Sequence, residues 1–324
     1  MKLTVTSSPH IRNKVNTKSI MLDVVIALVP ALLAGVLHFG PRALVVAGVC
    51  IVAALVAEWI CGLVFYKRNT LTDGSAVVTG LLLAFNVPAS LPWWMCLIGS
   101  AFAIIVVKMV FGGIGNNFVN PALAARAFLL ASFPVAMTMW TKTGINWVST
   151  GNIDAYTTAT PLNFLKAGES GLEALADNGI TLTDMFIGNI GGCIGETSAI
   201  LVILGGVYLM YKGIINYVIP TFYIATVSIL MFILGGFNFS FVMYELLAGG
   251  LMLGAFFMLT DYTTSPMTKQ GQIIYAVLAG LITTVIRLYG GYPEGVSYSI
   301  LLVNVMTPLI DKYTKTKVFG EVAK

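Results

Sequence analysis

Charged residues are scarce in this sequence. Only 10% of its 324 residues are Asp, Glu, Lys or Arg, whereas a soluble globular domain carries about 25%. A soluble protein of this size is therefore excluded, and so is a disordered chain. The 18 Lys and Arg residues exceed the 14 Asp and Glu residues by too little to form a basic surface. We therefore expect no nucleic-acid partner.

Cysteine and histidine are rare as well. The four cysteines show no Cys-x-x-Cys spacing and three of them lie in apolar runs, which argues against a disulfide framework or a metal site. The two histidines, His10 and His38, are too far apart in the sequence to suggest a ligand pair. Neither a phosphate-binding loop nor a dinucleotide-binding glycine fingerprint occurs. A hydrolase, a nucleotide-driven pump and a haem protein would all lack the residues they need, and we assign no catalytic side chain.

Apolar residues, in contrast, make up 57% of the chain, and the mean hydropathy is +0.89. Both values are typical of a polytopic membrane protein, so we predict an all-α fold with about ten transmembrane helices. The third, sixth and tenth apolar segments are short and flanked by Gly or Pro, which suggests broken or half-spanning helices. The predicted segments are 20–39, 43–65, 74–88, 93–111, 118–139, 196–211, 214–235, 241–260, 272–289 and 296–310.

Basic residues are distributed unevenly among the loops. If the N-terminus is cytoplasmic, 12 of the 18 Lys and Arg residues lie on the cytoplasmic side and 3 on the outer side, with 3 inside or at the ends of segments. The positive-inside rule therefore predicts that both termini are cytoplasmic. The first segment is long and nine more follow, so we interpret it as an uncleaved span rather than a signal peptide.

The two halves of the chain resemble each other weakly, since three pairs of similar motifs recur at a near-constant offset. Five segments per half is an odd number, so the halves would cross the membrane in opposite directions and form an inverted repeat. A binding site would then lie near the midplane where they meet. The alternative is a helical bundle with chance matches of Gly and Pro. The predicted units are 1–139 (tail and first repeat), 140–195 (outer loop) and 196–324 (second repeat and cytoplasmic tail).

The outer loop contains a motif with two interpretations. Thr160 followed by Pro161 is typical of a helix start, with Thr at the N-cap. In addition, the residues Asp154, Thr157, Ala159 and Thr160 match the pattern Asp-x-x-(Ser/Thr)-x-Ala-Thr. This pattern resembles the recognition sequence of the extracytoplasmic flavin transferase, which joins the phosphate of FMN to the last Thr. A helix N-terminus would favour the negative charge of such a phosphodiester.

Several motifs occur together along the chain: "SSPHIR" (7–12), "LTDGSAVVTGLLLAFNVP" (71–88), "FGGIGNNFVNPALAARAFL" (111–129), "TTATP" (157–161) and "GETSA" (195–199). In this order they resemble the D subunit of the Rnf ion-translocating electron transport complex. The sister family, the B subunit of the Na⁺-translocating NADH:quinone reductase, usually carries a longer N-terminal extension. The resemblance covers the whole chain.

This resemblance implies a subunit of a bacterial inner-membrane complex that couples electron flow between ferredoxin and NAD⁺ to Na⁺ or H⁺ movement. It implies covalent FMN on Thr160 and allows a second, non-covalent flavin (riboflavin or FMN) in the membrane. The implied fold is the five-plus-five fold of urea transporters. The implied partners are the other Rnf subunits, including a second covalent-FMN subunit and membrane iron–sulfur subunits, the flavin transferase during maturation, and membrane lipid.

Further candidate residues have both a structural and a functional interpretation. Asn117 and Asn120 lie in a Gly- and Asn-rich stretch that suits either the edge of an isoalloxazine ring or a capped helix start. We interpret Thr72 with Asp73 as a helix cap rather than a cofactor contact, and we interpret Glu196 in the same way. Arg126 is either paired inside the protein or a snorkelling side chain. The candidate list for ion coupling is Asp23, Glu58, Asp73, Glu245 and Asp261.

Two other functions remain open at this point. A transporter or channel for a small polar solute would explain the segments and the repeat equally well, but not the motif that ends at Thr160. A structural subunit with a vestigial flavin site is the third possibility.

Overall fold

The computed structural model describes residues 16–66, 70–140, 159–196, 198–291 and 294–315. Within these ranges the chain is helical and contains no β-strand, which confirms the all-α prediction for the described residues. A single backbone bridge joins Pro88 to Cys193, and the Ile194 N–H donates to the Val87 carbonyl at 3.3 Å. These contacts tie the end of one helix in the first half to the turn that opens the second half.

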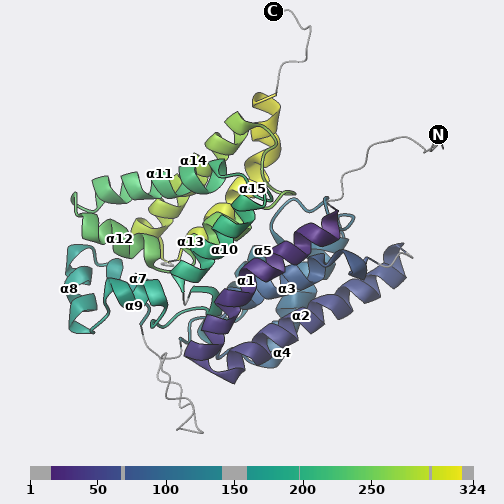
Figure 1. Ribbon diagram of the computed structural model, residues 1–324, viewed down its shortest axis with the longest axis horizontal. Coiled ribbons are helices and arrows are strands. Elements are labelled where there is room, and N and C mark those ends of the chain that lie inside the picture. Colours follow the sequence, from purple (N-terminus) through teal and green to yellow (C-terminus); the bar gives the residue numbers. More distant parts are fainter. Residues whose placement is uncertain (1–15, 67–69, 141–158, 197, 292–293, 316–324) are drawn as a thin grey trace, which may run out of the picture.

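The first half forms the group of purple to blue helices in Figure 1. Helix α2 packs against α3 and α4, and α5 packs against α3 and η3. Two of the helices, α2 and α4, continue into the wider π-helical turns η1 and η3. The elements are α1 (Thr17–Phe39), α2 (Pro41–Cys61), η1 (Gly62–Tyr66), η2 (Leu71–Asp73), α3 (Ser75–Phe85), α4 (Trp93–Ala101), η3 (Phe102–Met109), α5 (Pro121–Ser132) and α6 (Pro134–Met137).

Three short helices lie between the two halves in the sequence and are drawn at the lower left of Figure 1. They are α7 (Pro161–Leu165), α8 (Glu169–Asp177) and α9 (Leu182–Ile187), and the 3₁₀ turn η5 (Ile194–Glu196) follows them. Both α7 and α9 pack against α12 (Phe239–Leu247) of the second half. Helices α7 and α9 are therefore anchored on the second half, whereas η5 packs against α1 and α3 of the first half.

The second half is the green to yellow group in Figure 1. Helix α11 packs along α14, which also packs against α15. The eighth predicted segment is broken: α12 and the stretch Leu251–Met258 meet at an angle of 68°. The elements are α10 (Ala199–Tyr211), α11 (Val218–Leu234), α12 (Phe239–Leu247), α13 (Leu251–Leu253), η6 (Gly254–Met258), α14 (Lys269–Tyr289) and α15 (Val296–Tyr313).

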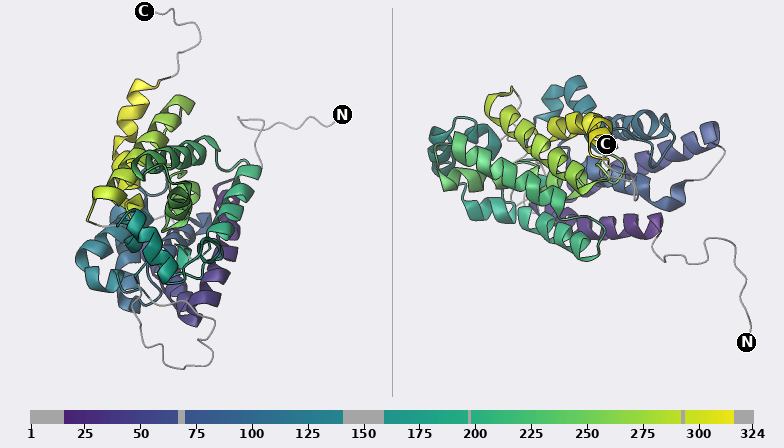
Figure 2. Two further views of the ribbon diagram at one scale, coloured as in Figure 1. Left: turned by 90° about the vertical axis from the view of Figure 1, so that its left-hand side faces the viewer. Right: turned by 90° about the horizontal axis from the view of Figure 1, so that it is seen from above.

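The two halves meet along α1 with α10 and along α5 with α15. Seen from above in Figure 2, they form two groups that lie side by side. Gly205 of α10 faces the carbonyl of Ala27 in α1 so closely that a Cβ there would clash with it. Glycine is therefore required for this approach of the two backbones.

Helix lengths only partly match the ten predicted spans. By length and composition, three described helices can cross a membrane, or four if the bent pair counts as one span. Each predicted segment does contain a helix, but α3, α5 and α10 have 11, 12 and 13 residues. The short fifth helix was not predicted; it ends at Ser132 because Pro134 follows. The tenth, predicted to be short, continues to Tyr313 and has 18 residues.

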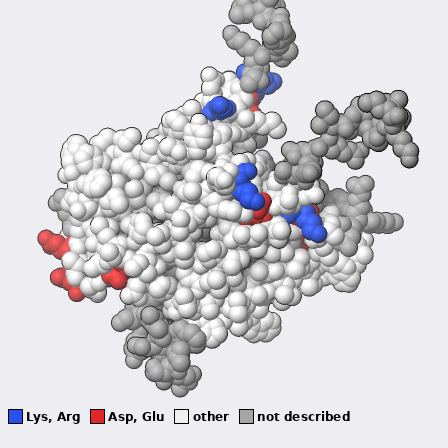
Figure 3. Space-filling view, viewed as in Figure 1, with Lys and Arg blue, Asp and Glu red and all other residues white. Residues whose placement is uncertain are grey.

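Many of the apolar residues of this chain lie on its surface. Figure 3 shows a face that is mostly uncharged, with acidic residues gathered at the edge where α8 lies and basic residues, some beside acidic ones, on the opposite side. Large apolar side chains are exposed along the helices, among them Leu37 at 65%, Val64 at 66% and Phe239 at 70%. A surface of this kind is stable in an apolar solvent, which agrees with a multi-pass membrane protein.

Candidate functional site

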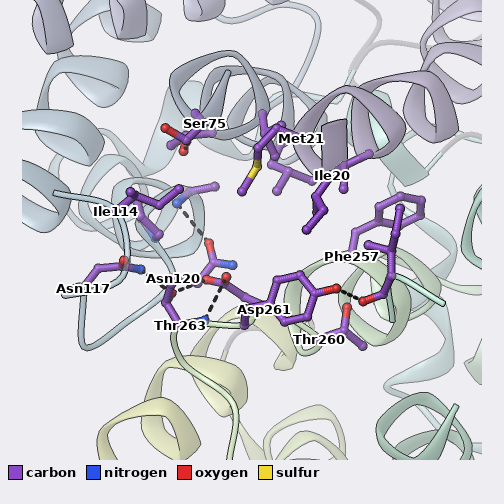
Figure 4. Close-up of a pocket in the computed structure, with 18 of the residues that line it drawn as sticks. Ile20, Met21, Ser75, Ile114, Asn117, Asn120, Phe257, Thr260, Asp261 and Thr263 are labelled. Atoms are coloured by element: carbon purple, nitrogen blue, oxygen red, sulfur yellow. Dashed lines mark hydrogen bonds between the residues drawn. The ribbon is translucent and has the colours of Figure 1, made fainter. Parts of the chain in front are cut away.

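Two groups of polar residues lie inside this apolar chain. The first surrounds a cavity of about 280 Å³ where the two halves meet, which we call the seam cavity. Its lining residues come from α1, α3, η3, α10 and η6, from the loop before α5 and the start of α5, and from the loops after α10 and η6. Figure 4 shows Asn117, Asn120, Asp261 and Thr263 on one side of the opening, with Ile20 and Met21 on the other.

Asn117 and Asn120 are both buried and both connect the halves. The Asn117 amide donates to the Thr263 hydroxyl at 2.9 Å, across the seam. Asn120 caps α5, because its side-chain oxygen accepts from the N–H groups of Ala122 and Leu123. This confirms the capping interpretation of Asn120, with Pro121 as the first helical residue. Since both residues also line the cavity, capping and ligand contact are compatible here.

Asp261 places a carboxyl group at the cavity wall. It accepts from the Thr263 N–H at 3.3 Å and from the Thr263 hydroxyl at 3.1 Å. Burial raises the pKa of this carboxyl, and the Thr263 groups act in the opposite direction. Asp73, another acid on the candidate list for ion coupling, does not line this cavity.

Asp73 instead opens helix α3. Its carboxylate accepts from the Ser75 N–H at 2.9 Å, while Gly74, with φ +78°, is the N-cap residue itself. Asp73 is therefore not the N-cap residue of α3, but its carboxylate does bind the first N–H group of this helix, so its role at a helix start agrees with the sequence interpretation. Thr72 is exposed and lines neither polar site.

A buried ion pair lies beside the cavity. The Lys108 ammonium contacts a Glu58 carboxylate oxygen at 2.8 Å and donates to the Ser75 hydroxyl at 2.6 Å. Thr70 donates to the same Glu58 oxygen at 2.9 Å. The second oxygen, Oε2, finds no partner among the described residues. Lys108 lines the cavity, so its charge is held at the wall by an acid on α2.

The second polar group begins at Thr160, whose cavity is also lined by Glu196 and Glu294, and continues through these carboxylates to Arg126 and Cys193. We call these five residues the Thr160 cluster. Thr160 is 7% exposed and lines, with Glu196 and Glu294, a small cavity of about 10 Å³. It is the N-cap residue of α7, as predicted, but its hydroxyl makes no capping hydrogen bond in the described chain. The oxygen predicted to carry flavin is therefore not engaged in holding the helix.

Arg126 is the positive centre of this cluster. It is 4% exposed, so the snorkelling interpretation is wrong and the pairing interpretation is confirmed. One Nη donates to the Ser297 hydroxyl at 2.5 Å, and the other pairs with the Glu294 carboxylate and contacts the Cys193 sulfur at 3.7 Å. These contacts fasten α5 to the start of α15.

Glu196 does not cap α10, contrary to the sequence interpretation. It ends the turn η5, where its carboxylate accepts from the Cys193 N–H at 3.2 Å. The ligand atoms of Cys193, Glu196 and Glu294 lie within 4.8 Å of one another, a spacing that a metal ion could bridge. However, Arg126 already occupies Glu294, and burial raises the pKa of the Cys193 thiol. The paired Glu294 carboxylate and the protonated Cys193 thiol therefore make this group a poor cation site.

The other candidates are placed as follows. Asp154 and Thr157 lie outside the described residues, and Ala159 is exposed. Asp23 accepts from the Tyr208 hydroxyl at 2.9 Å and pairs with Lys212, which joins α1 to the end of α10. Glu245 pairs with Arg287 at 2.8 Å.

Glu294 is the residue that sequence reasoning missed. A signal existed, because the stretch YGGYPEG (289–295) in the second half resembles the Gly- and Asn-rich stretch FGGIGNN (111–117) in the first half. Glu294 is the one charged residue in it. Its partner Arg126 is 168 residues away, so no local pattern could pair them.

The fold and these sites define a multi-pass α-helical membrane protein with a small-molecule-sized cavity between its two halves. The profile of the NQR2, RnfD, RnfE family matches residues 4–320, and the chain belongs to this family.

Similar proteins include the D subunit of a Na⁺-translocating ferredoxin:NAD⁺ oxidoreductase complex from Acetobacterium woodii, 51% identical over 99% of this chain and 96% of the relative. The D subunit of a proton-translocating ferredoxin:NAD⁺ oxidoreductase complex from Clostridium ljungdahlii is 49% identical over 98% and 96%. The D subunit of an ion-translocating oxidoreductase complex from Pectobacterium atrosepticum is 35% identical over 99% of both chains.

Proposed function

We propose that this chain is the D subunit of an ion-translocating ferredoxin:NAD⁺ oxidoreductase complex of the bacterial inner membrane, and that it carries FMN covalently on Thr160. The names of its relatives support the complex. The observation that carries the flavin assignment is Thr160 itself, the last residue of the flavinylation-like pattern, with a hydroxyl free of any capping bond in the described chain.

The surroundings of Thr160 are chemically suited to this group. A phosphoester between the Thr160 oxygen and FMN would carry a negative charge, and the buried Arg126 guanidinium lies in the same cluster. The cavity of about 10 Å³ holds about one water molecule, so the flavin ring would lie outside it. FMN supplies the redox chemistry, while the protein orients it and sets its electrostatics.

The seam cavity suits a second, non-covalent flavin. Its volume of about 280 Å³ is near the lower end of small-molecule sites, which begin at roughly 300 Å³. Apolar walls that carry a few amide, hydroxyl and carboxyl groups match a flat aromatic ring with a polar edge. Asn117 and Asn120 would face that edge and Ile20 and Met21 the ring.

The remaining expectations belong to this proposal. The halves form a five-plus-five inverted repeat like that of urea transporters, with both termini cytoplasmic and residues 140–195 outside. The partners are the other Rnf subunits, among them a second covalent-FMN subunit and membrane iron–sulfur subunits, with the flavin transferase acting during maturation.

The ion that moves is Na⁺ or H⁺, since the relatives' names include both. Among the candidate acids, Glu58 and Glu245 are each paired with a buried cation, which weakens them as ion ligands.

The deciding experiment is flavin fluorescence of the denatured subunit on a gel, after expression with the flavin transferase. We expect a fluorescent band for the wild type, a dark band for Thr160→Ala, and a fluorescent band for the matched control Thr183→Ala from the same outer segment. A dark wild-type band, with the transferase active on a control substrate, would favour the solute transporter. If Asp154→Ala kept full fluorescence, Thr160 could remain the acceptor but the recognition pattern would be wrong.

A further inference from the structure

Arg126 is held in the protein with one donor unused. Its two Nη atoms contact Ser297, Glu294 and Cys193, but the Nε–H finds no hydrogen-bond partner among the described residues. The side chain is 4% exposed, so bulk water does not replace the missing acceptor. A buried guanidinium N–H without an acceptor is costly, and such a group points to an acceptor that belongs there.

Arg287 provides a comparison within the same region. It is 2% exposed and uses its nitrogens on the Glu245 carboxylate, the Glu245 and Ala248 carbonyls and the Glu294 carbonyl. Arg287 therefore has a structural explanation in the broken helix between α12 and α13. Arg126 has no equivalent set of protein acceptors in the described chain.

Glu294 links Arg126 to Thr160, because it pairs with the guanidinium and also lines the cavity at Thr160. The cavity of about 10 Å³ is too small for a phosphate group while the Glu294 side chain stays in place. The Glu294 side chain is 21% exposed, against 4% for Arg126. Of the two partners, Glu294 is therefore the one whose side chain can turn toward the surface.

A phosphodiester can replace this carboxylate with little change in charge. Both groups carry one negative charge and offer two oxygens to the planar fork of a guanidinium. The cluster also contains Glu196, whose carboxylate would repel a phosphodiester unless Arg126 balanced it. The residues around Thr160 thus require a cation for an attached phosphate, and Arg126 is the cation that they hold.

We propose that Arg126 is the counter-charge for the phosphodiester at Thr160, and that Glu294 occupies this place until the flavin is attached. Flavin attachment then exchanges the Glu294 carboxylate for the phosphate, and Glu294 turns toward the surface. The proposal rests on covalent FMN at Thr160. Arg126 acts in it as a positioning residue, since it holds the phosphate and not the flavin ring.

The test compares thermal stability with and without the covalent flavin. The purified full chain in detergent is prepared after expression with the active transferase or with an inactive one, and the rise in melting temperature on flavin attachment is measured. The proteins compared are the wild type, Arg126→Gln, Arg126→Lys, Glu294→Gln and Glu196→Gln. The last is the matched control, a carboxylate at the same cavity that Arg126 does not contact in the described chain.

Attachment should raise the melting temperature of the wild type. The rise should be largest in Glu294→Gln, because no carboxylate has to be displaced from Arg126. In Glu196→Gln it should increase less, because only a repulsion is relieved. It should be lost in Arg126→Gln and partly restored in Arg126→Lys. The ³¹P resonance of the bound phosphodiester should also shift in Arg126→Lys relative to the wild type.

An equal rise in the wild type and in Arg126→Gln would overturn the proposal. So would a smaller rise in Glu294→Gln than in the wild type, and this variant decides the matter if Arg126→Gln does not fold. A wild type that takes no covalent flavin from an active transferase would overturn the proposed function together with this inference. The two failures are distinguishable because only the second leaves every band dark.

Discussion

At the scale of single residues, the buried pair of Lys108 and Glu58 carries the clearest energetic consequence. Removing one partner of a buried ion pair leaves an uncompensated charge and costs about 3–5 kcal/mol. We therefore expect Lys108→Met to lower the stability of the chain by about this amount. The double variant Lys108→Met with Glu58→Gln should recover part of the loss, because neither charge remains.

Unfolding by titration with SDS in mixed micelles measures this effect. The control is Lys212→Met, since Lys212 pairs with Asp23 at the surface at 3.4 Å, where solvent screens the interaction. It should change the midpoint little. If Lys108→Met were as mild as Lys212→Met, the pair of Glu58 and Lys108 would not be a tight buried contact.

Single residues also show how far the sequence can be interpreted. Asn120 and Thr160 are predictable as helix starts because an N-cap is a local signal that Pro at the next position reinforces. The partners of Arg126 and Lys108 are not, because ion pairs across 168 and 50 residues have no local pattern. Burial decides which interpretation holds, and burial is a property of the packed chain.

At the scale of elements, the break between α12 and α13 depends on a residue without a side chain. Gly249 has φ +66°, and a Cβ there would lie 3.3 Å from a Leu162 methyl group and 3.4 Å from an Arg287 nitrogen. A non-glycine residue in this conformation costs about 1–2 kcal/mol. We therefore expect Gly249→Ala to destabilise the chain by about that much.

The matched control for this prediction is Gly48→Ala in the exposed face of α2, where a Cβ meets nothing within 4 Å. Alanine is favoured over glycine inside a helix by about 0.5–1 kcal/mol, so this variant should gain stability. Both changes are measured as midpoints of SDS unfolding. Equal and small effects of the two substitutions would mean that the break does not need the left-handed conformation at Gly249.

Helix α9 provides a prediction that depends on pH. Thr181 and Asp184 form a capping box, and the Thr181 hydroxyl holds the pKa of Asp184 below its usual value. A carboxyl with a lowered pKa stabilises the fold above its unfolded pKa of about 3.9, and this contribution is lost as the pH falls through the folded pKa. Asp184→Asn should therefore speed hydrogen exchange in residues 181–188 at neutral pH but not in acid.

Hydrogen–deuterium exchange, corrected for the intrinsic rate at each pH, measures this difference. Asp177→Asn, at the end of the neighbouring helix α8, is the control and should leave residues 181–188 unchanged at every pH. A difference between wild type and Asp184→Asn that persisted in strong acid would argue against the carboxylate as the stabilising group.

At the scale of the whole molecule, composition predicted the class and the helical positions but not the lengths. Each predicted apolar segment contains a helix because apolar runs in a membrane must satisfy their backbone internally. The bend of 68° in the eighth segment was not predicted, since its stability depends on Arg287 from a later helix. Likewise, the seam cavity exists only because residues far apart in the sequence meet, such as Asn117 and Thr263, 146 positions apart.

The contact between the two halves leads to the last prediction, which separates the two proposed flavins. A Cβ on Gly205 would press on the Ala27 carbonyl and lie 3.0 Å from the ring of Phe257, which lines the seam cavity. Gly205→Ala should therefore move α1 away from α10 and change the cavity. The Thr160 cluster is built by α5, α7, η5 and α15, and the atoms that a Cβ on Gly205 would meet belong to none of these elements.

Acid denaturation of the purified chain separates flavin that is released from flavin that stays attached. We expect Gly205→Ala to lose the released flavin and keep the attached one, whereas Thr160→Ala should do the reverse. Gly48→Ala, which adds the same methyl group away from the seam, should keep both. Because the two sites share no lining residue in the described chain, a parallel loss of both flavins in Gly205→Ala would mean that the seam cavity and the Thr160 cluster are one coupled site.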